Sequence, residues 1–244
     1  MAVPVPSVTK VNKAGDVLRS MLTAPGSSTI SSPLDTDIDR VFEALDVLEA
    51  WRAAHAAPLQ AATMGLRSRV STVRCSQVEV SQRLKRIPTI LDKLRREPGM
   101  NLGRIEDIGG CRAVLRDLDE VYRVLGRYQM RNVDVVRVRD YIEAPKDDGY
   151  RAVHVIARYH GRRIEVQLRT HAQHEWAYTV ESVTSRFDLD IKAGGGPQPV
   201  RDWFAAVSEA MALEEHGNTV GAELLERVST LRAAAQPYLQ GRPR

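Results

Sequence analysis

Apolar residues near the start of the chain recur every three to four positions, which is the spacing of one face of an α-helix. The pattern predicts a helix with Asp35 or Thr36 as its N-cap. Its apolar stripe consists of Ile38, Val41, Phe42, Leu45, Leu48 and Trp51. Further helices are expected over residues 9–23, from Thr170 onward, over about 201–215 and over about 219–235. Both ends of the chain are therefore predicted to be helical.

The middle of the chain has a different pattern, because apolar and polar residues alternate there as they do in β-strands. Strands are expected over residues 111–115, 133–142, 151–159 and 163–169. Between them a helix is expected over residues 117–129, with Asp117 and Glu120 spaced as a capping box, a spacing that Thr170 and Gln173 repeat. This order predicts an α+β fold with a central mixed, mainly antiparallel β-sheet flanked by helices.

Two segments have the composition of linkers, since Ser, Pro and Gly dominate them. They are "APGSSTISSPLD" (24–35) and "KAGGGPQP" (192–199). The chain is accordingly expected to have three parts. These are an N-terminal helical region with a linker over residues 1–70, a catalytic core over residues 71–190 and a C-terminal helical extension over residues 191–244.

Composition restricts the class of protein without choosing a function. With 43% hydrophobic and 27% charged residues the chain is an ordinary globular protein. We expect no membrane segment and no secretory signal. Cys75 and Cys111 are too few for a disulfide framework or a zinc site, so we expect a cytoplasmic protein in which both are packing residues. A net charge of +4 permits an anionic partner such as a nucleotide or RNA but does not require one.

A basic cluster surrounds the predicted start of a short helix in "RLKRIPTILDK" (83–93). Pro88 suits the first turn of a helix, and Thr89 and Lys93 would then share one helical face. Arg83 and Lys85 precede this helix, so cations, backbone N–H groups and the helix dipole would converge where a phosphate can bind. A solvated basic loop and helix explains the same residues, and this cluster alone leaves both interpretations open.

An acidic residue lies between that cluster and a predicted strand, in "EDIGGCR" (106–112). Two glycines allow a tight turn beside Asp107, and the strand carries Arg112. An acid next to a phosphate-binding surface suggests Mg²⁺, which takes few carboxylates and uses substrate phosphates as other ligands. An ordinary surface turn is the alternative.

The stretch "PKDDGYRAVH" (145–154) and the strand "IEVQLRT" (164–170) place many polar groups on one predicted hairpin. Gly161 is at the position of a two-residue hairpin loop. Such a loop pairs even positions on the first strand with odd positions on the second. One face would then hold Tyr150, His154, Arg158, Glu165, Gln167 and Arg169. This face is too polar for a core and indicates a binding site.

Together these motifs carry a resemblance to a known family. "RLKRIPTILDKL", "DIGGCRAV", "DYIEAPKDDGYRAVH", "EVQLRT" and "WAYTVE", in this order, resemble the synthetase domain of RelA/SpoT-type (p)ppGpp synthetases over about residues 80–185. The resemblance implies a nucleotidyltransferase-like synthetase fold. It also implies an ATP-dependent pyrophosphokinase, which moves the β,γ-diphosphate of ATP to a ribose 3′-hydroxyl. No hydrolase signature is present, so a synthetase without a hydrolase domain is expected.

The resemblance also implies roles for individual residues. ATP would be bound by Arg83, Lys85, Thr89, Lys93 and Arg112. Asp107 would bind Mg²⁺, and Glu165 would be a second ligand or the general base. The acceptor would lie against Tyr150 as a stacking platform, with its surroundings formed by Lys146, Asp148, His154, Gln167 and Arg169.

Three departures from the family pattern lie on the acceptor side. Asp148 stands where the family has asparagine, Ala152 where it has serine, and Ser182 where it has histidine. In addition, "LEAWRAAHAAPL" (48–59) with the basic cluster is similar to a group that includes toxic small alarmone synthetases of toxin–antitoxin systems. Several members of that group modify the 3′-terminal adenosine of tRNA, so this resemblance implies a tRNA acceptor, inhibition of translation and an antitoxin partner.

Other functions stay open at this point. A small alarmone synthetase that makes (p)ppGpp from GTP or GDP shares every ATP-side residue, as does an enzyme that makes ppApp-type products from adenine nucleotides. A non-catalytic nucleotide-binding or RNA-binding regulator on the same fold is an alternative of another class. The retained Asp107, Tyr150 and Glu165 argue against that regulator.

Overall fold

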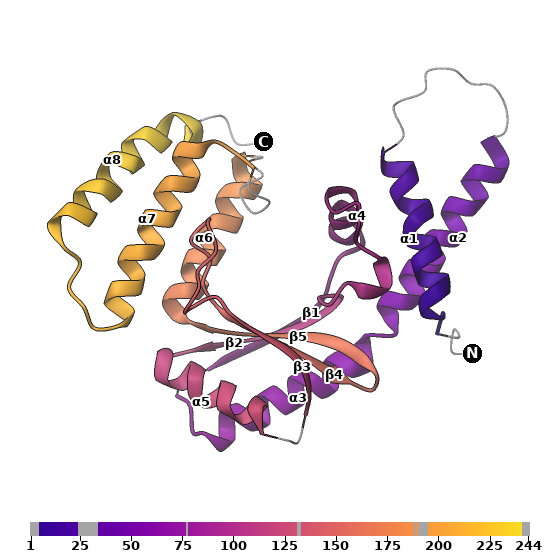
Figure 1. The fold of residues 1–244 in the computed structure, drawn as a ribbon, viewed down its shortest axis with the longest axis horizontal. Coiled ribbons are helices and arrows are strands. Elements are labelled where there is room, and N and C mark those ends of the chain that lie inside the picture. Colours follow the sequence, from indigo (N-terminus) through magenta and orange to yellow (C-terminus); the bar gives the residue numbers. More distant parts are fainter. Residues whose placement is uncertain are drawn as a thin grey trace. The chain divides into compact units, whose positions relative to one another are not determined.

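The computed structural model describes residues 5–23, 34–76, 78–130, 133–187, 189 and 195–240 (Figure 1). Its strands are β1 (Glu79–Leu84), β2 (Gly109–Leu115), β3 (Asp134–Asp140), β4 (Val153–Tyr159) and β5 (Arg162–Thr170). Its helices are α1 (Val8–Thr23), α2 (Leu34–Ala53), α3 (Ala56–Thr72), α4 (Ile87–Arg96), η1 (Leu102–Arg104), α5 (Leu118–Gln129), α6 (His171–Phe187), α7 (Gln198–Glu215) and α8 (Ala222–Leu239).

The strands form one mainly antiparallel sheet in the order β1-β2-β5-β4-β3. With helices on either side in the sequence, this confirms the predicted α+β class. The strand β1 was not expected from the sequence. Its residues, "EVSQRL", lack a clear apolar alternation, and none of them is buried, because β1 is an edge of the sheet.

The hairpin of β4 and β5 closes with the predicted two-residue loop. His160 and Gly161 both have positive φ, 47° and 77°, as a type I′ turn requires. Along β5 the side chains of Ile164, Val166 and Leu168 are buried, whereas those between them are partly exposed. The predicted register of apolar and polar positions is therefore confirmed.

The chain forms two compact units, each assembled from three separate segments. Unit 1 comprises Met1–Gly65, Ser81–Cys111 and Ile156–Val166. Unit 2 comprises Leu66–Val80, Arg112–Val155 and Gln167–Arg244. The expected boundaries at residues 70 and 190 stay predictions.

The core of unit 1 joins α1, α2, α4 and the turn η1. It is formed by Val11, Leu18, Val47, Leu48, Trp51, Ile90, Leu94, Leu102, Ile105 and Ile108, with Ala14 and Ala44. A Cβ atom on Gly15 would lie 2.7 Å from Leu102 Cβ, so only glycine lets α1 approach η1 this closely. Because Ile90 and Leu94 of α4 are buried in this core, the opposite side of the helix, with its cations, faces the surface of unit 1.

The predicted apolar stripe of α2 is only partly covered. Leu48 and Trp51 are buried, but Ile38 and Phe42 are 47% and 62% exposed. Helical periodicity identifies residues that share a face, but the length of the covering helix decides how many are buried. The side chains of Asp35 and Thr36, the first predicted caps, and most of both predicted linkers lie outside the described residues.

The core of unit 2 contains α6, α7 and α8, which lie next to one another in Figure 1. It is formed by Trp176, Ala177, Val180, Val200, Phe204 and Ala235. The Trp176 indole nitrogen donates a hydrogen bond of 2.9 Å to the Phe204 carbonyl, which satisfies the one polar atom of this buried side chain. Trp51, Trp176 and the partly buried Trp203 are thus packing residues.

Two predicted helix starts are confirmed by their hydrogen bonds. Asp117 caps α5 by accepting from the Glu120 amide at 2.9 Å. At α6, Thr170 and Gln173 form a reciprocal pair: the backbone N–H of each residue donates to the side-chain oxygen of the other at 3.2 Å. Within the described part of the chain, no helix has the length and apolar character that crossing a bilayer needs.

Acidification is expected to destabilise unit 1 through His55, which is 2% exposed with its Nδ1 at 2.8 Å from the Trp51 carbonyl. Burial lowers the pKa of His55, and the charge of Arg162 adds to this. The unfolded chain therefore takes up a proton below about pH 6.5 before the folded chain does, so unfolding becomes easier as the pH falls. The slope from one such group is at most about 1.4 kcal/mol per pH unit.

Urea unfolding of the wild type and His55→Gln between about pH 7 and about pH 5 measures this slope. The variant is expected to show the shallower dependence. The exposed His171 provides the matched control, since His171→Gln should keep the wild-type slope. Equal slopes in all three proteins would show that His55 is not the responsible group.

Candidate functional site

The predicted site residues divide between the two units. Unit 1 holds Arg83, Lys85, Thr89, Lys93, Asp107 and Glu165. Unit 2 holds Arg112, Lys146, Asp148, Tyr150, His154, Gln167 and Arg169. Each unit brings several of its own members into contact, and the two groups are described in turn.

In unit 1 two lysines converge on one carboxylate, and we call Lys85, Lys93 and Asp107 the donor cluster. Lys85 Nζ forms a short ion pair with Asp107 Oδ2, and Lys93 Nζ lies 3.4 Å from Asp107 Oδ1. The three side chains are 14%, 23% and 23% exposed, so they are shielded but still reachable from solvent. A group with two cations and one anion has a surplus positive charge that suits a phosphate.

The backbone around Lys85 is fixed from two sides. The Lys85 amide donates to the Ile108 carbonyl at 2.8 Å, which links the end of β1 to the segment that follows Asp107. The Lys85 carbonyl accepts from Arg52 Nε at 2.7 Å. Arg52 was missed in the sequence, because its partner is 33 residues away and a lone arginine on a helix gives no local signal.

The start of α4 is the second part of this surface. Pro88 lies in the first turn, as predicted, and Arg86 precedes the helix in an extended conformation. Arg83 and Thr89 are exposed, and Thr89 and Lys93 are four residues apart on α4. Arg83 and Arg86 are thus exposed cations that flank Lys85 in the chain. Pro88 has no N–H and the Thr89 amide donates to the Arg86 carbonyl at 3.0 Å, so neither position offers a free helix N–H group.

Glu165 is a partly exposed carboxylate on β5 between two buried valine and isoleucine neighbours. It lies within electrostatic reach of Cys111, a buried thiol whose pKa is raised to about 12, mainly by burial and in part by the Glu165 charge. Cys111 therefore stays protonated near neutral pH, which agrees with the packing role predicted for it.

Asp107 and Glu165 suit a Mg²⁺ ion that takes part of its ligands from a bound nucleotide. No group of three or more His, Cys, Asp or Glu side chains gathers among the described residues, so they hold no all-protein cage. Mg²⁺ commonly uses one or two carboxylates and takes its other ligands from phosphates and water. Asp107 and Glu165, both in unit 1 and both partly exposed, fit that requirement, and the magnesium site stays a prediction.

In unit 2 the predicted acceptor residues surround Tyr150, and we call Lys146, Tyr150, His154, Gln167 and Arg169 the tyrosine cluster. Arg169 Nη2 donates to the Tyr150 hydroxyl at 2.5 Å and to Gln167 Oε1 at 2.9 Å. The same hydroxyl lies 2.6 Å from His154 Nε2. Because arginine only donates, the hydroxyl proton is directed to His154 Nε2. Of the six residues predicted to share one face, these hydrogen bonds join four, namely Tyr150, His154, Gln167 and Arg169.

Cations lie over the aromatic rings of the tyrosine cluster. Lys146 Nζ is 4.9 Å from the Tyr150 ring centroid and 4.8 Å from that of Tyr141. Arg169 Cζ is 5.0 Å from the Tyr150 ring centroid. Lys146 is exposed, whereas Arg169 is 7% exposed and its Nε has no hydrogen-bond partner among the described residues. Buried donors of this kind call for a ligand or water.

Tyr141 lies beside the tyrosine cluster, although no role was predicted for it. Its ring packs edge-on against Tyr150 at 5.9 Å and against His154 at 5.2 Å between centroids. Its amide donates to the Ala152 carbonyl at 2.9 Å, which ties the end of β3 to the segment after Tyr150. Its position inside the quoted stretch "DYIEAPKDDGYRAVH" was the available signal.

Asp148 shapes the loop that carries Tyr150. Its Oδ1 accepts from the Tyr150 amide at 2.9 Å, a side-chain turn that asparagine makes equally well. The Gly149 amide donates to the Lys146 carbonyl at 2.8 Å within the same turn. One carboxylate oxygen is thus used locally, and contact of Asp148 with an acceptor stays a prediction.

Arg112 lies in β2 and contributes positive charge within unit 2. Burial lowers the pKa of His174 on α6, and the charges of Arg112 and Arg169 lower it further. His174 is therefore neutral near pH 7. The carboxylates of Glu79 and Glu175 act on the pKa of His174 in the opposite direction, so charges of both signs lie around this part of α6.

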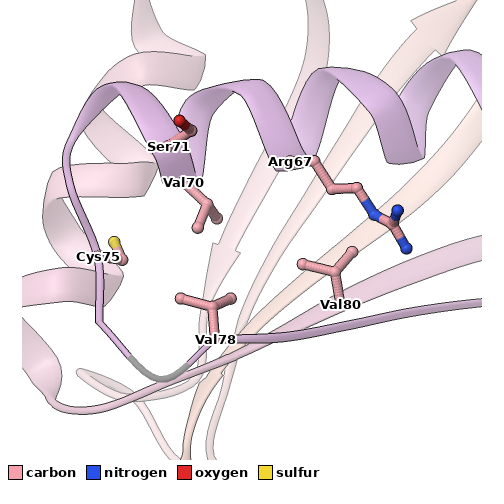
Figure 2. A pocket seen from close by; sticks show the side chains of 6 residues that line it. All are labelled: Arg67, Val70, Ser71, Cys75, Val78 and Val80. Atoms are coloured by element: carbon pink, nitrogen blue, oxygen red, sulfur yellow. The ribbon is translucent and has the colours of Figure 1, made fainter.

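A separate cavity of about 460 Å³ lies in unit 2 at the end of α3 and the start of β1 (Figure 2). It is lined by Arg67, Val70, Ser71, Cys75, Val78 and Val80. None of the predicted site residues lines it. Figure 2 shows its three valines facing one another, and we assign no role to it.

Comparisons with known proteins connect these clusters to a family. Residues 82–185 match the family described as a region found in RelA / SpoT proteins. Over 159 residues the chain is 29% identical to the GTP pyrophosphokinase YjbM of Bacillus subtilis (strain 168). This stretch covers 60% of the chain and 73% of YjbM.

Solved structures agree on the fold. The small alarmone synthetase 2 from Bacillus subtilis has a TM-score of 0.56 at 21% identity, covering 68% of this chain and 92% of that one. The small alarmone synthetase 1 from Bacillus subtilis, bound to its product pppGpp, has a TM-score of 0.55 at 24% identity, covering 77% and 99%.

The matched segment begins just before Arg83 and ends after the tyrosine cluster, close to the predicted range of about 80–185. The further resemblance to toxic small alarmone synthetases stays a prediction. Residues 82–185 of this chain thus match the region found in RelA / SpoT proteins, and the fold is similar to that of the small alarmone synthetases.

Proposed function

We propose that this chain is an ATP-dependent pyrophosphokinase, which transfers the β,γ-diphosphate of ATP to a ribose 3′-hydroxyl and releases AMP. The observation that carries the proposal is the donor cluster, in which Lys85 and Lys93 contact the single carboxylate of Asp107. When a nucleotide polyphosphate and its divalent cation bind, new contacts would replace the ion pairs of Asp107 with the two lysines. The phosphates would take the lysines, and the cation would take the carboxylate.

On the ATP side, Lys85 and Lys93 would bind the phosphates, while Arg83, Thr89 and Arg112 would orient the nucleotide. Mg²⁺ held by Asp107 would neutralise phosphate charge during transfer, and Glu165 would be either its second ligand or the general base. Both lysines are already partly shielded from solvent, so little reorganisation is needed when charge develops.

The chemical step is a displacement at phosphorus. The acceptor 3′-oxygen forms a bond to the β-phosphorus, and the bond from that phosphorus to the oxygen bridging the α- and β-phosphates breaks, so AMP leaves with that oxygen. The proton of the 3′-hydroxyl passes to a base, and Glu165 is proposed for this role. Positioning and charge neutralisation supply most of the rate in such transfers.

On the acceptor side, Tyr150 would stack on a base with Lys146 and Gln167 beside it. The unpartnered Nε of Arg169 supports a ligand at this place. We propose the 3′-terminal adenosine of tRNA as the acceptor, on the departures at Asp148, Ala152 and Ser182 and the resemblance to toxic small alarmone synthetases. A single-stranded 3′ end presents an unstacked base to an aromatic ring.

A guanine nucleotide is the second candidate acceptor. YjbM is named a GTP pyrophosphokinase, and the small alarmone synthetase 1 was solved with pppGpp. Asp148 also keeps the turn that asparagine would make, so this departure alone does not remove guanine recognition.

One assay decides the activity and the acceptor together. The purified chain is incubated with γ-labelled ATP and, in separate reactions, deacylated tRNA, GDP, GTP or ATP alone. Label in the tRNA band supports the proposed acceptor, whereas label only in a guanine nucleotide overturns it in favour of the second candidate. If no reaction moves label while AMP also fails to form, the pyrophosphokinase proposal is wrong.

A further inference from the structure

Helix α7 lies outside the segment that matches the RelA/SpoT region, yet it contacts the loop that presents Tyr150. The contact begins at Gly149, which has a φ of +87°. A Cβ atom on Gly149 would lie 2.9 Å from Ala205 Cα and 3.0 Å from Ser208 Cβ. The backbone of the loop therefore rests directly on one face of α7.

Ser208 connects α7 to both sides of Tyr150 along the chain. Its hydroxyl donates to the Gly149 carbonyl at 2.5 Å and accepts from Arg151 Nε at 3.1 Å. Ser208 and Arg151 are each 3% exposed. Hydrogen bonds in such a buried place hold the backbone on either side of Tyr150 with little competition from water.

Glu215, the last residue of α7, completes the attachment of Arg151. Arg151 Nη1 forms a short ion pair with Glu215 Oε2, and the Glu215 side chain is 10% exposed. A carboxylate at the C-terminal end of a helix is unfavourable for the helix itself, because the helix dipole is negative there. Its position therefore has to be explained by its partners rather than by helix stability.

The other oxygen of Glu215 reaches a second segment. Glu215 Oε1 accepts from Thr170 Oγ1 in a short hydrogen bond and from Gln173 Nε2 at 3.3 Å. Thr170 directly follows Arg169, whose guanidinium holds the Tyr150 hydroxyl. The Glu215 carboxylate thus contacts both segments that position Tyr150. Through Arg151 it fixes the loop that carries the Tyr150 backbone, and through Thr170 it fixes the end of β5, where Arg169 binds the Tyr150 hydroxyl.

We propose that Glu215 and Ser208 are positioning residues for acceptor binding, so that α7 forms part of the acceptor site. This inference rests on the proposed function, because it assigns acceptor binding to the tyrosine cluster. Neither residue touches the acceptor. They act through Arg151, Gly149 and Thr170, and their effect should be confined to the tyrosine cluster.

The test compares Glu215→Gln with Glu214→Gln, its exposed neighbour on the same helix. Loss of one buried charge-assisted contact is expected to raise the KM for the acceptor about tenfold in Glu215→Gln. The KM for ATP and the kcat at saturating acceptor should stay within about threefold, because the donor cluster belongs to unit 1 and this network to unit 2. Glu214→Gln should behave as the wild type.

Hydrogen–deuterium exchange gives a readout that needs no activity. In Glu215→Gln the amides of Gly149 and Tyr150 should exchange faster, while those of Lys85 and Thr89 should keep their wild-type rates. If Glu215→Gln does not fold, Ser208→Ala replaces it, with an expected rise in acceptor KM of about threefold and faster exchange at the same two amides.

The outcomes separate the two proposals. An equal rise in the KM values for ATP and acceptor, or unchanged exchange at Gly149 and Tyr150, overturns the positioning role. If the wild type transfers no diphosphate at all, the proposed function fails. In that case exchange alone decides whether α7 holds the loop.

Discussion

Asp107→Asn is expected to lower diphosphate transfer about a thousandfold, since it removes a charged group that acts where charge develops on the phosphates. The same change should have the opposite effect on ATP binding without metal. In the wild type, Lys85 and Lys93 contact Asp107. Without that carboxylate charge both ammonium groups are available to phosphate, so metal-free ATP should bind as tightly as in the wild type or more tightly.

Isothermal titration with ATP, with and without Mg²⁺, measures this effect beside the transfer assay. The matched control is Asp92→Asn on α4, whose carboxylate pairs with Arg95 and Arg96 at the surface. Surface pairs contribute little, so this variant should keep transfer within about twofold. If Asp107→Asn weakened metal-free ATP binding, Asp107 would be a structural partner of the lysines rather than a metal ligand.

Tyr150→Ala is expected to raise the KM for the acceptor roughly thirtyfold, the effect of losing one base-stacking contact. Tyr150→Phe keeps the ring but loses the hydroxyl that joins Arg169 to His154. Its acceptor KM should therefore rise by only about threefold to fivefold. The comparison separates the ring, which would stack, from the hydroxyl, which organises the cluster.

The control for the aromatic ring is Tyr178→Ala on α6, since that side chain is 62% exposed. It should leave both KM values unchanged. ATP binding provides the second check, because Tyr150 belongs to unit 2 and the donor cluster to unit 1. A similar loss for Tyr150→Phe and Tyr150→Ala would mean that the hydroxyl network, and not stacking, determines acceptor affinity.

Features that depend on short stretches of sequence could be predicted. The loop at Gly161 and the alternation along "IEVQLRT" predict that Tyr150, His154 and Arg169 share one face. Pro88 marked the start of α4, and the spacing of Thr170 and Gln173 marked the start of α6. Each of these features depends on residues that favour a turn or a helix start, or on the regular spacing of apolar residues, and both can be read from a short stretch of sequence.

Features that depend on distant contacts could not be predicted. Arg52, Ser208 and Glu215 each bind a segment that lies between 33 and 64 residues away. An isolated serine or glutamate on a helix is most often a solvated residue, so nothing local distinguishes these. The strand β1 could not be predicted for a related reason. It is an edge strand with polar residues, and it lacks the alternation of apolar and polar residues that marks a half-buried strand.

The division of the chain into interleaved segments has a consequence during synthesis on the ribosome. Unit 1 includes Ile156–Val166, so 166 of the 244 residues must be made before its last segment exists. Its helices α1, α2 and α4 can pack together early, but Arg162 of β5, which lies over the Trp51 ring of α2, emerges late. The sheet also stays incomplete until its central strand β5 has been made, and in that period chaperones would be expected to engage the nascent chain.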